Sequence, residues 1–442
     1  MNENEIGHKL KNYYTMLITK IRLSNFKNFG DTEVNLGKMN VIVGANAAGK
    51  SNFIQTLSFI RDIRNFGIEN AISLKGGMGY LRNLYVKGNK PVRVELHFDT
   101  DNQMYIQYLF DGQVCVFQLI KAYSIEFITN EATGYEVITE SITFHSILKK
   151  DLLTDKIGEF ESTILVKKGQ FTFKTDFNKN LLLSIKKNAG IETNLDGNIN
   201  ESLYLPFEAI KIIMPSEATH KRKTILEVFP GILPSPLFSF AIYDFDLKKA
   251  KQSSPITGKV ELEENGENVA IVLKNILEDK EKTRQFTNLL SDILPFVKQM
   301  GIDKFYDNSL LFKVKEIYQQ ANPIPSSLLS DGTIAMTLMV VALFFEQKNL
   351  AIFEEPEQGI HPALIAKLME YFYEASHKKQ MIITTHNAEV LKHTKLADLY
   401  LISRNEKGVA SINKPAEQEM VQAFLQNELG IDQLFTQNLL DI

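Results

Sequence analysis

The residues best suited to chemistry lie at positions 44 to 51, which read Gly-Ala-Asn-Ala-Ala-Gly-Lys-Ser and match GxxxxGK[ST]. Gly44 and Gly49 let the backbone curl so that successive N–H groups point at one anion. Lys50 is then placed to reach the β- and γ-phosphates, and Ser51 to ligate Mg²⁺. The pattern predicts a site for ATP and Mg²⁺. Its expected nucleotide-binding residues are Gly44, Ala45, Asn46, Ala47, Ala48, Gly49, Lys50, Ser51 and Asn52.

Two adjacent carboxylates follow a second apolar segment. Residues 350 to 357 read Leu-Ala-Ile-Phe-Glu-Glu-Pro-Glu, a short strand that ends in Glu354 and Glu355. Ligands of α/β folds bind where the carboxyl ends of buried parallel strands meet the edge of the sheet. We therefore expect Glu354 to share Mg²⁺ with Ser51, and Glu355 to act as general base on the attacking water. The alternative is a pair of solvated acids at a strand end.

Two other segments carry polar residues beside apolar ones. Ser330, Asp331 and Gly332 precede a strongly apolar segment at 334–345, so they predict a helix N-terminus, which favours an anion through free N–H groups and the helix dipole. His386 ends a buried strand that starts at Gln380. A serine N-cap is common and a lone histidine is usually structural. The order of the four segments therefore carries more weight than any one of them.

The flanking sequence predicts the elements that position these residues. A strand at 40–43 enters the phosphate loop, and a helix with an apolar face leaves it at Asn52. Apolar and polar side chains alternate in runs that predict an antiparallel β lobe over residues 90 to 180. Those runs are 92–98, 104–110, 114–119, 123–129, 136–144 and 160–166. Apolar residues recur at helical spacing over 268–300, without a sustained heptad pattern, and predict short helices.

The order of segments resembles the ABC-type ATPase heads of the SMC, RecF and OLD-like group, within the AAA-family branch found in many bacterial defence systems. The start ITKIRLSNFKNF, the loop GANAAGKSN, the signature LSDGT, FEEPEQGIHP and TTHNAEVL carry the resemblance, and they span most of the chain. It implies an α/β fold, an ABC/SMC-head-like P-loop ATPase with a mixed central sheet, an antiparallel β lobe and a helical insertion.

The resemblance also implies residue roles and an assembly. Ser330, Asp331 and Gly332 would bind the nucleotide held by another subunit, so that ATP is sandwiched in a homodimer or higher homo-oligomer. His386 would be the switch histidine, catalytic together with Glu355. Gly359, Ile360 and His361 would form the D-loop at the dimer seam.

Some positions depart from the family pattern. Ala45 and Ala47 stand where many relatives carry Pro and Gly, which reduces the conformational freedom of the loop. Asp331 replaces the usual first Gly of the signature, and Glu354 replaces the usual Asp. No Q-loop glutamine can be assigned.

The same reading divides the chain into five regions. They are an N-terminal extension at 1–15, an N-terminal half of the ATPase head at 16–200, a mostly helical insertion at 201–328, a C-terminal half of the head at 329–415 and a helical tail at 416–442. In SMC proteins the insertion would be a long coiled coil, which this sequence does not contain.

Composition limits the classes of protein that fit. Lys and Arg number 49 and Asp and Glu 53, so a net charge of −4 does not suggest a chain that coats nucleic acid. The basic cluster at 220–223 leaves DNA contact open, although it also fits a solvated surface. One cysteine, no signal-peptide pattern and no apolar run of membrane-spanning length predict a soluble cytoplasmic protein without a membrane partner.

Three functions remain open at this point. The favoured one is an ATPase that regulates a separate effector, a nuclease or toxin, in anti-phage defence. This rests on the resemblance and on a tail that lacks the metal-binding acids of OLD-type nucleases. The alternative is a RecF- or SMC-like repair ATPase that acts directly on DNA. The third is an ABC transporter motor, against which the EEPE segment and the missing Q-loop argue.

Overall fold

The computed structural model describes most of the chain. The described residues are 17–99, 106–110, 114–131, 134–149, 156–168, 170–175, 224–228, 240–256, 259–305, 308–318, 322–417 and 431–436. They fall into two compact units. Unit 1 comprises 1–37, 55–238 and 404–411, and unit 2 comprises 38–54, 239–403 and 412–442. The predicted extension at 1–15, the basic cluster at 220–223 and most of the predicted helical tail lie outside the described residues.

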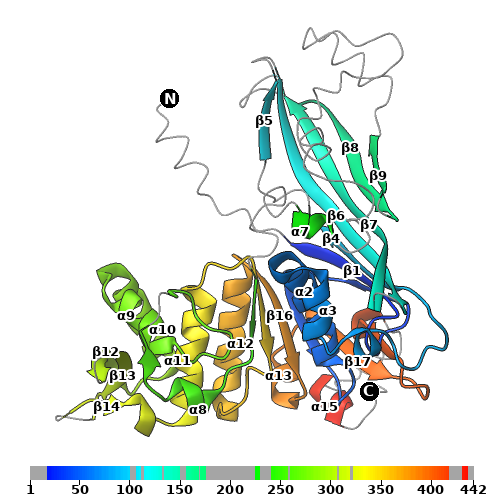
Figure 1. The fold of residues 1–442 in the computed structure, drawn as a ribbon. Helices are drawn as coiled ribbons and strands as arrows, with labels where there is room; N and C mark the ends of the chain where they lie inside the picture. The colour runs from blue at the N-terminus through cyan, green and yellow to red at the C-terminus, as the bar shows by residue number, and fades with distance from the viewer. Residues whose placement is uncertain are drawn as a thin grey trace. The chain divides into compact units, whose positions relative to one another are not determined.

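Unit 1 is built on an antiparallel sheet with the strand order β2-β1-β4-β6-β7-β8-β9, and β5 pairs with β6 (Figure 1). Aromatic side chains fill its core, where the Phe59 ring lies 5.8 Å from Phe26 and 5.6 Å from Phe127. This sheet confirms the predicted antiparallel lobe and extends it with the first two strands of the chain. The elements are β1 (Ile18–Ser24), β2 (Thr32–Asn35), β4 (Val92–Phe98), β5 (Ile106–Phe110), β6 (Val114–Asn130), β7 (Gly134–Lys149), β8 (Lys156–Lys167), β9 (Gln170–Thr175), α3 (Ile68–Leu74), α4 (Met78–Leu81) and α7 (Ile225–Val228).

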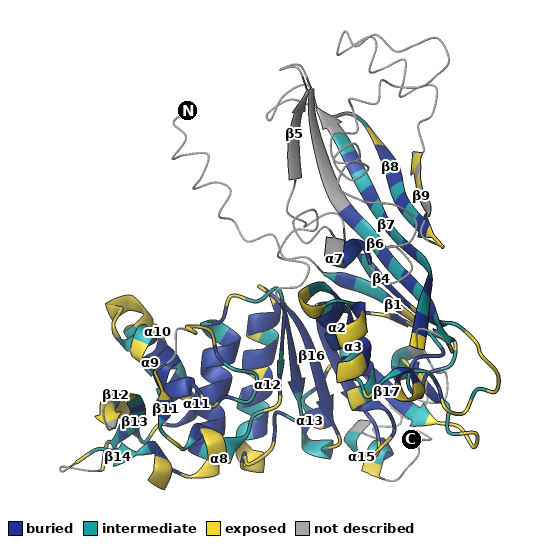
Figure 2. Ribbon diagram, viewed as in Figure 1, coloured by how far each residue is buried: buried dark blue, intermediate teal, exposed yellow. Residues whose placement is uncertain are grey.

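Unit 2 contains the central sheet, whose strand order is β10-β15-β16-β3-β17-β18. Neighbours from β10 to β17 run parallel, so their carboxyl ends meet at one edge. The strands are β3 (Met39–Val43), β10 (Phe240–Tyr243), β15 (Leu350–Glu354), β16 (Gln380–Thr385), β17 (Leu399–Arg404) and β18 (Ala410–Asn413). β3 and β16 are buried at every position, and Figure 2 shows β16 in the colour of buried residues. Their side chains are mostly apolar, as expected for buried parallel strands, with buried polar residues at Asn40, Gln380, Thr384 and Thr385.

Helices alternate with the strands of this sheet along the chain, and the loops between them lie at its edges. They are α2 (Lys50–Phe66), within which the division between the units falls, α8 (Leu247–Ala250), α9 (Val269–Leu277), α10 (Lys280–Ile293), α11 (Asp331–Phe344), α12 (Pro362–Ser376), α13 (Ala388–Lys392) and α15 (Ile431–Thr436). Single 3₁₀ turns cover 326–328, 396–398 and 415–417. Helix α11 is buried continuously from Thr333 to Leu343, whereas α12 begins with His361 as N-cap and Pro362 in its first turn. The predicted α/β fold with a central sheet and an antiparallel β lobe is thereby confirmed.

The stretch from 201 to 328 differs from the mostly helical insertion that we expected. Its described residues include α9 and α10, and they also form a small antiparallel sheet with the order β11-β13-β12, in which β14 pairs with β13. These strands are β11 (Ser254–Pro255), β12 (Val297–Phe305), β13 (Ser309–Glu316) and β14 (Ile324–Pro325). The strand β10, also from this stretch, pairs with β15 and therefore belongs to the central sheet. The helical spacing at 268–300 corresponds to α9 and α10, whereas the small sheet is built mainly on β12 and β13, which are neighbours in sequence.

Among the described residues, no helix is both long enough and apolar enough to cross a membrane. The apolar helix α11 has 14 residues.

Candidate active site

The phosphate loop joins β3 to α2, as predicted. Lys50 begins α2 and is 8% exposed, and its Nζ donates hydrogen bonds to the carbonyl oxygens of Gly44 at 2.8 Å and Ala45 at 3.2 Å. Burial lowers the pKa of Lys50, and the charges of nearby glutamates counteract this shift. The Lys50 side chain therefore lies over the loop in which the phosphates of a nucleotide would bind. Ala45, Asn46 and Ala47 form the exposed crest of that loop, and Asn52 lies half-buried in the first turn of α2.

The loop backbone is shaped by two left-handed residues and one crowded glycine. Ala47 has φ 64° and Gly49 has φ 130°. A Cβ added at Gly44 would lie 2.4 Å from the carbonyl oxygen of Ile402, so only glycine fits there. Ala47 therefore adopts the left-handed conformation that glycine adopts without strain, and its Cβ makes this conformation sterically costly.

The predicted metal-binding pair is in contact. Ser51 Oγ donates a hydrogen bond to Glu354 Oε2 at 2.8 Å, which joins the start of α2 to the end of β15. Burial raises the pKa of Glu354, and the charges of Asp244 and Glu355 add to this shift. A hydroxyl and a carboxylate are oxygen ligands of the kind that Mg²⁺ prefers. In the described part of the chain no group of three His, Cys, Asp or Glu side chains is placed to hold a metal ion.

Glu355 is held in an unusual conformation next to His386. Its φ is 44°, a left-handed value that is uncommon outside glycine and asparagine, and its N–H donates to the Thr384 carbonyl at 2.9 Å. Its Oε1 lies 2.8 Å from His386 Nδ1, and its Oε2 accepts from Gln358 Nε2 at 2.9 Å. Burial would raise the pKa of Glu355, but the bonds from Gln358 and His386 and the charges of His386 and Lys50 lower it overall. The carboxylate is therefore kept ionised, as a general base requires.

The signature residues form the exposed tip of α11. Ser330 is the N-cap, and its Oγ accepts from the Thr333 N–H at 3.2 Å. The Asp331 carboxylate pairs with Lys251 Nζ at 2.5 Å. A Cβ at Gly332 would lie 3.3 Å from the Gly359 carbonyl oxygen. These contacts come from the end of α8 and the loop before α12, whereas the contacts of Lys50 and Ser51 come from the phosphate loop and Glu354. The predicted pairing of this tip with a second subunit's nucleotide stays a prediction.

Four polar residues near the site were not assigned from the sequence, and one of them is Gln358, which donates to Glu355. Asp244 follows β10, level with Glu354 on β15, and lines a cavity together with Glu354 and Glu355. Glu357 contacts Thr385, and Lys251 contacts Asp331. A signal existed for Asp244 alone, because it follows a short apolar strand just as Glu354 does.

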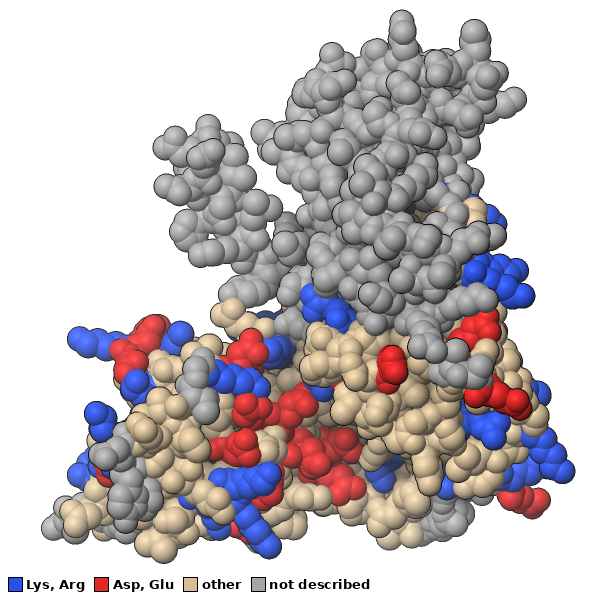
Figure 3. Space-filling model, in the orientation of Figure 1, with Lys and Arg blue, Asp and Glu red and all other residues tan. Residues whose placement is uncertain are grey.

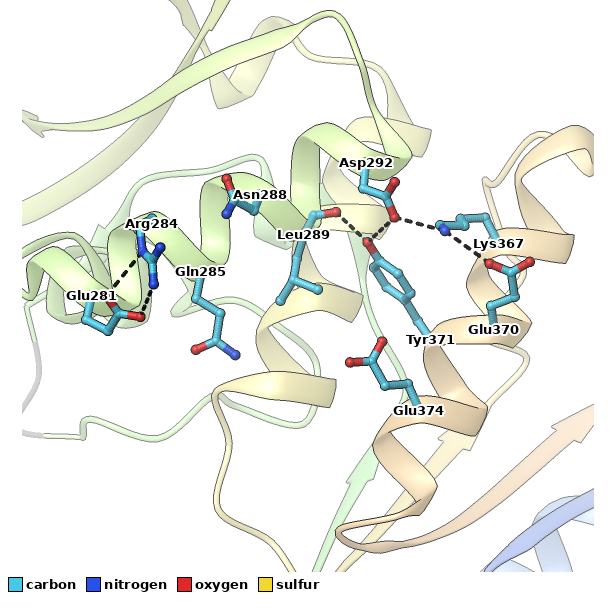
Figure 4. A pocket seen from close by; sticks show the side chains of 10 residues that line it. All are labelled: Glu281, Arg284, Gln285, Asn288, Leu289, Asp292, Lys367, Glu370, Tyr371 and Glu374. Carbon is cyan, nitrogen blue, oxygen red and sulfur yellow. Dashed lines mark hydrogen bonds and ion pairs between the residues drawn. The ribbon is translucent and has the colours of Figure 1, made fainter.

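A second concave region of unit 2 lies between α10 and α12, away from these residues (Figure 4). Asp292 accepts from the Tyr371 hydroxyl at 3.0 Å and pairs with Lys367 at 2.9 Å, and Arg284 pairs with Glu281 at 2.7 Å. The face drawn in Figure 3 carries a group of acidic side chains around α12. Because its cations are engaged by its own acids, this groove does not resemble a phosphate site.

Comparison with known proteins agrees with this geometry. Residues 39–129 and 227–392 match the protein family described as "AAA domain, putative AbiEii toxin, Type IV TA system". A 58-residue segment is 41% identical to the endonuclease GajA of Bacillus cereus, covering 13% of this chain and 10% of that protein. A longer match, 22% identical over 396 residues, covers 85% of this chain and 87% of an ATP/GTP phosphatase of Helicobacter pylori.

Solved structures of similar shape include SMC head domains. The Thermotoga maritima head is 13% identical with a TM-score of 0.38, and the match covers 90% of this chain and 98% of that one. The Pyrococcus yayanosii head with coiled coil and joint is 12% identical with a TM-score of 0.44, covering 93% and 99%.

The family match covers more than half of the chain, including the phosphate loop, the signature tip, the Glu-Glu strand and His386. It confirms the sequence-based recognition of an ABC/SMC-like ATPase. The chain therefore belongs to the AAA-domain ATPase family whose description includes the putative AbiEii toxin of type IV toxin–antitoxin systems.

Proposed function

We propose that this protein binds ATP with Mg²⁺, hydrolyses it to ADP and phosphate, and uses nucleotide-dependent dimerisation to control a separate effector protein in anti-phage defence. The observation that carries the proposal is the convergence of β3, β15 and β16 at one sheet edge. There Ser51 contacts Glu354 and Glu355 contacts His386. Each of these side chains was expected from the sequence to have a role in nucleotide chemistry.

The residues of the site divide the work of hydrolysis. Lys50 and the loop N–H groups bind the phosphate chain, and Ser51 with Glu354 would hold Mg²⁺, which when bound neutralises charge on the phosphates. Glu355, kept ionised, accepts a proton from the attacking water. His386 fixes the Glu355 carboxylate from one side and Gln358 fixes it from the other. These two hydrogen bonds orient the base.

The exposed tip of α11 supports the dimerisation step. Ser330 Oγ accepts from the Thr333 N–H and lies 2.9 Å from Thr333 Oγ1, where either hydroxyl can be the donor. When Thr333 donates, the Ser330 hydroxyl hydrogen is available to a phosphate oxygen of a second subunit. Lys251 neutralises Asp331, which would otherwise repel that phosphate. Contacts of this kind exist only while a γ-phosphate is present, so binding closes the dimer and hydrolysis releases it.

The effector part of the proposal draws on the relatives. The family description names a putative toxin of a type IV toxin–antitoxin system, and one matched segment belongs to an endonuclease. The matched segment covers about a tenth of that endonuclease. Direct action on DNA stays the alternative, and the basic cluster at 220–223 to which it points lies outside the described residues.

The test uses Glu355→Gln, which keeps the size of the side chain and removes the proton acceptor. We expect ATP binding to persist and hydrolysis to fall by about 10²- to 10⁴-fold, the usual contribution of a general base. In sedimentation velocity the variant should form a dimer or larger species with ATP and Mg²⁺ and not with ADP. Glu278→Gln, at the exposed end of α9, is the matched control and should behave like wild type. Identical sedimentation profiles with ATP and ADP would refute nucleotide-dependent dimerisation.

A further inference from the structure

Glu357 is a buried carboxyl group whose role the proposed hydrolysis leaves unexplained. It lies two residues after Glu355, is 7% exposed, and accepts a hydrogen bond at Oε1 from Thr385 Oγ1. Its second oxygen, Oε2, is buried and has no hydrogen-bond partner among the residues that the structure describes. Burial raises the pKa of Glu357, the bond from Thr385 opposes that shift, and the charge of Glu355 adds to it. A buried acid that is only half satisfied is unfavourable for stability, so its presence calls for a functional reason.

The bond from Thr385 continues into the backbone beyond the switch histidine. Thr385 Oγ1 accepts from the Asn387 N–H at 2.9 Å, and Asn387 Oδ1 accepts from the Glu389 N–H at 2.8 Å, which caps α13. Residues on both sides of His386 are thereby fixed. Two hydrogen bonds therefore link Glu357 to Thr385 and Thr385 to Asn387, the residues immediately before and after His386.

His386 depends on this support more than its neighbours do. Its side chain is 48% exposed, and the contact that orients its ring is the one to Glu355 at 2.8 Å. Thr384 and Thr385, by contrast, are buried within β16. A shift of the backbone at 385–387 would therefore move the imidazole relative to Glu355 without disturbing the sheet. Misplacement of a reacting group by about 1 Å costs on the order of 10²-fold in rate.

We propose that Glu357 is a positioning residue, which through Thr385 and Asn387 sets His386 against Glu355 for the hydrolytic step. This inference rests on the proposed ATPase function and adds a residue to it. Glu357 does not touch the phosphate chain in this account. Its loss should therefore lower kcat and leave nucleotide affinity nearly intact, since Lys50 and Ser51 keep their own contacts.

The experiment measures kcat and KM for ATP in wild type and four variants. Glu357→Gln keeps an oxygen that can accept from Thr385, so its kcat should stay within about 3-fold of wild type. Glu357→Ala and Thr385→Val each break the connection and should lower kcat by about 10- to 100-fold, with KM changed by less than about 3-fold. Thr385→Ser keeps the hydroxyl and should retain activity.

A double-mutant cycle with His386→Ala separates positioning from general damage. If Glu357 acts through His386, the double variant Glu357→Ala with His386→Ala should be no slower than His386→Ala alone. The positioning role would be overturned if the fold-losses in kcat of the two single variants multiplied in the double variant. It would also be overturned if Glu357→Gln were as slow as Glu357→Ala. ATP binding by each variant shows that the site is folded, and Thr385→Val carries the test if Glu357→Ala does not fold. A wild type that fails to hydrolyse ATP would instead overturn the proposed function itself.

Discussion

At residue 47 the phosphate loop carries an alanine in a left-handed backbone conformation, with φ 64°. An L residue with a Cβ is strained there by about 1–2 kcal/mol, whereas glycine is not. Ala47→Gly should therefore raise the free energy of unfolding by up to about 1 kcal/mol, after the greater entropy that glycine gives the unfolded chain is subtracted. Urea denaturation of the two proteins measures this difference. A fall in stability would show that the loop is not strained at this position.

The sequence was sufficient to propose roles for residues whose type and local position suggest a chemistry. Lys50, Ser51, Glu354, Glu355 and His386 each stand at the end of a strand or the start of a helix, in spacings that the chemistry requires. Glu357 and Lys251 could not be assigned in this way. Their roles depend on contacts with Thr385 and Asp331, which the fold brings together from distant parts of the chain.

At the scale of elements, Lys379 links the start of β16 to the end of α11. Its Nζ donates to the carbonyl oxygens of Ala342 at 3.2 Å and Glu346 at 2.6 Å, which lie in and just beyond the last turn of α11. Burial lowers the pKa of Lys379 to about 8, from a usual value of 10.5. Between these two values the unfolded chain binds a proton that the folded chain does not, so stability attributable to Lys379 should rise with pH.

The measurement compares wild type with Lys379→Met by denaturant unfolding between pH 7.5 and 10.5. Wild type should gain stability relative to the variant above pH 8, by at most about 1.4 kcal/mol per pH unit. Lys378→Met, at the exposed neighbouring position, should show no such difference from wild type. Parallel pH profiles for wild type and Lys379→Met would mean that the buried amine keeps an ordinary pKa.

Elements were predictable where the periodicity was strong and the segment long. The alternation at 92–98 coincides with β4, and the apolar run at 334–345 lies almost wholly within α11. In the small sheet at 254–325, β11 and β14 have two residues each, too short for a period to appear. β13 has eight residues in which buried and half-buried positions alternate, so its period was present in the sequence and was missed. The strand β10 has four residues, and its membership of the central sheet is decided by pairing with β15.

At the scale of the whole molecule, a shared nucleotide site predicts complementation between two inactive proteins. Lys50→Ala damages the phosphate loop, and Ser330→Leu damages the tip offered to the partner. In a mixed dimer the intact loop of one subunit faces the intact tip of the other, so one site of two is complete. An equal mixture should recover about a quarter of wild-type ATPase activity.

The control for complementation is a mixture of Lys50→Ala with Glu355→Gln. Both residues belong to the loop side of the site in one subunit, so every site in the mixed dimer carries a defect. This mixture should stay inactive. Recovery in both mixtures, or in neither, would contradict the sandwich arrangement.

The burial of α11 has a consequence for how such an assembly would signal. Every side chain from Thr333 to Leu343 is enclosed, so no face of the helix is free to slide over its neighbours (Figure 2). A displacement of Ser330 cannot be accommodated by a shift of α11 alone, because closely packed protein interiors resist such deformation. Unit 2 would therefore move as one rigid body. Loss of the γ-phosphate at Ser330 would then change the position of every surface of unit 2 that contacts another protein.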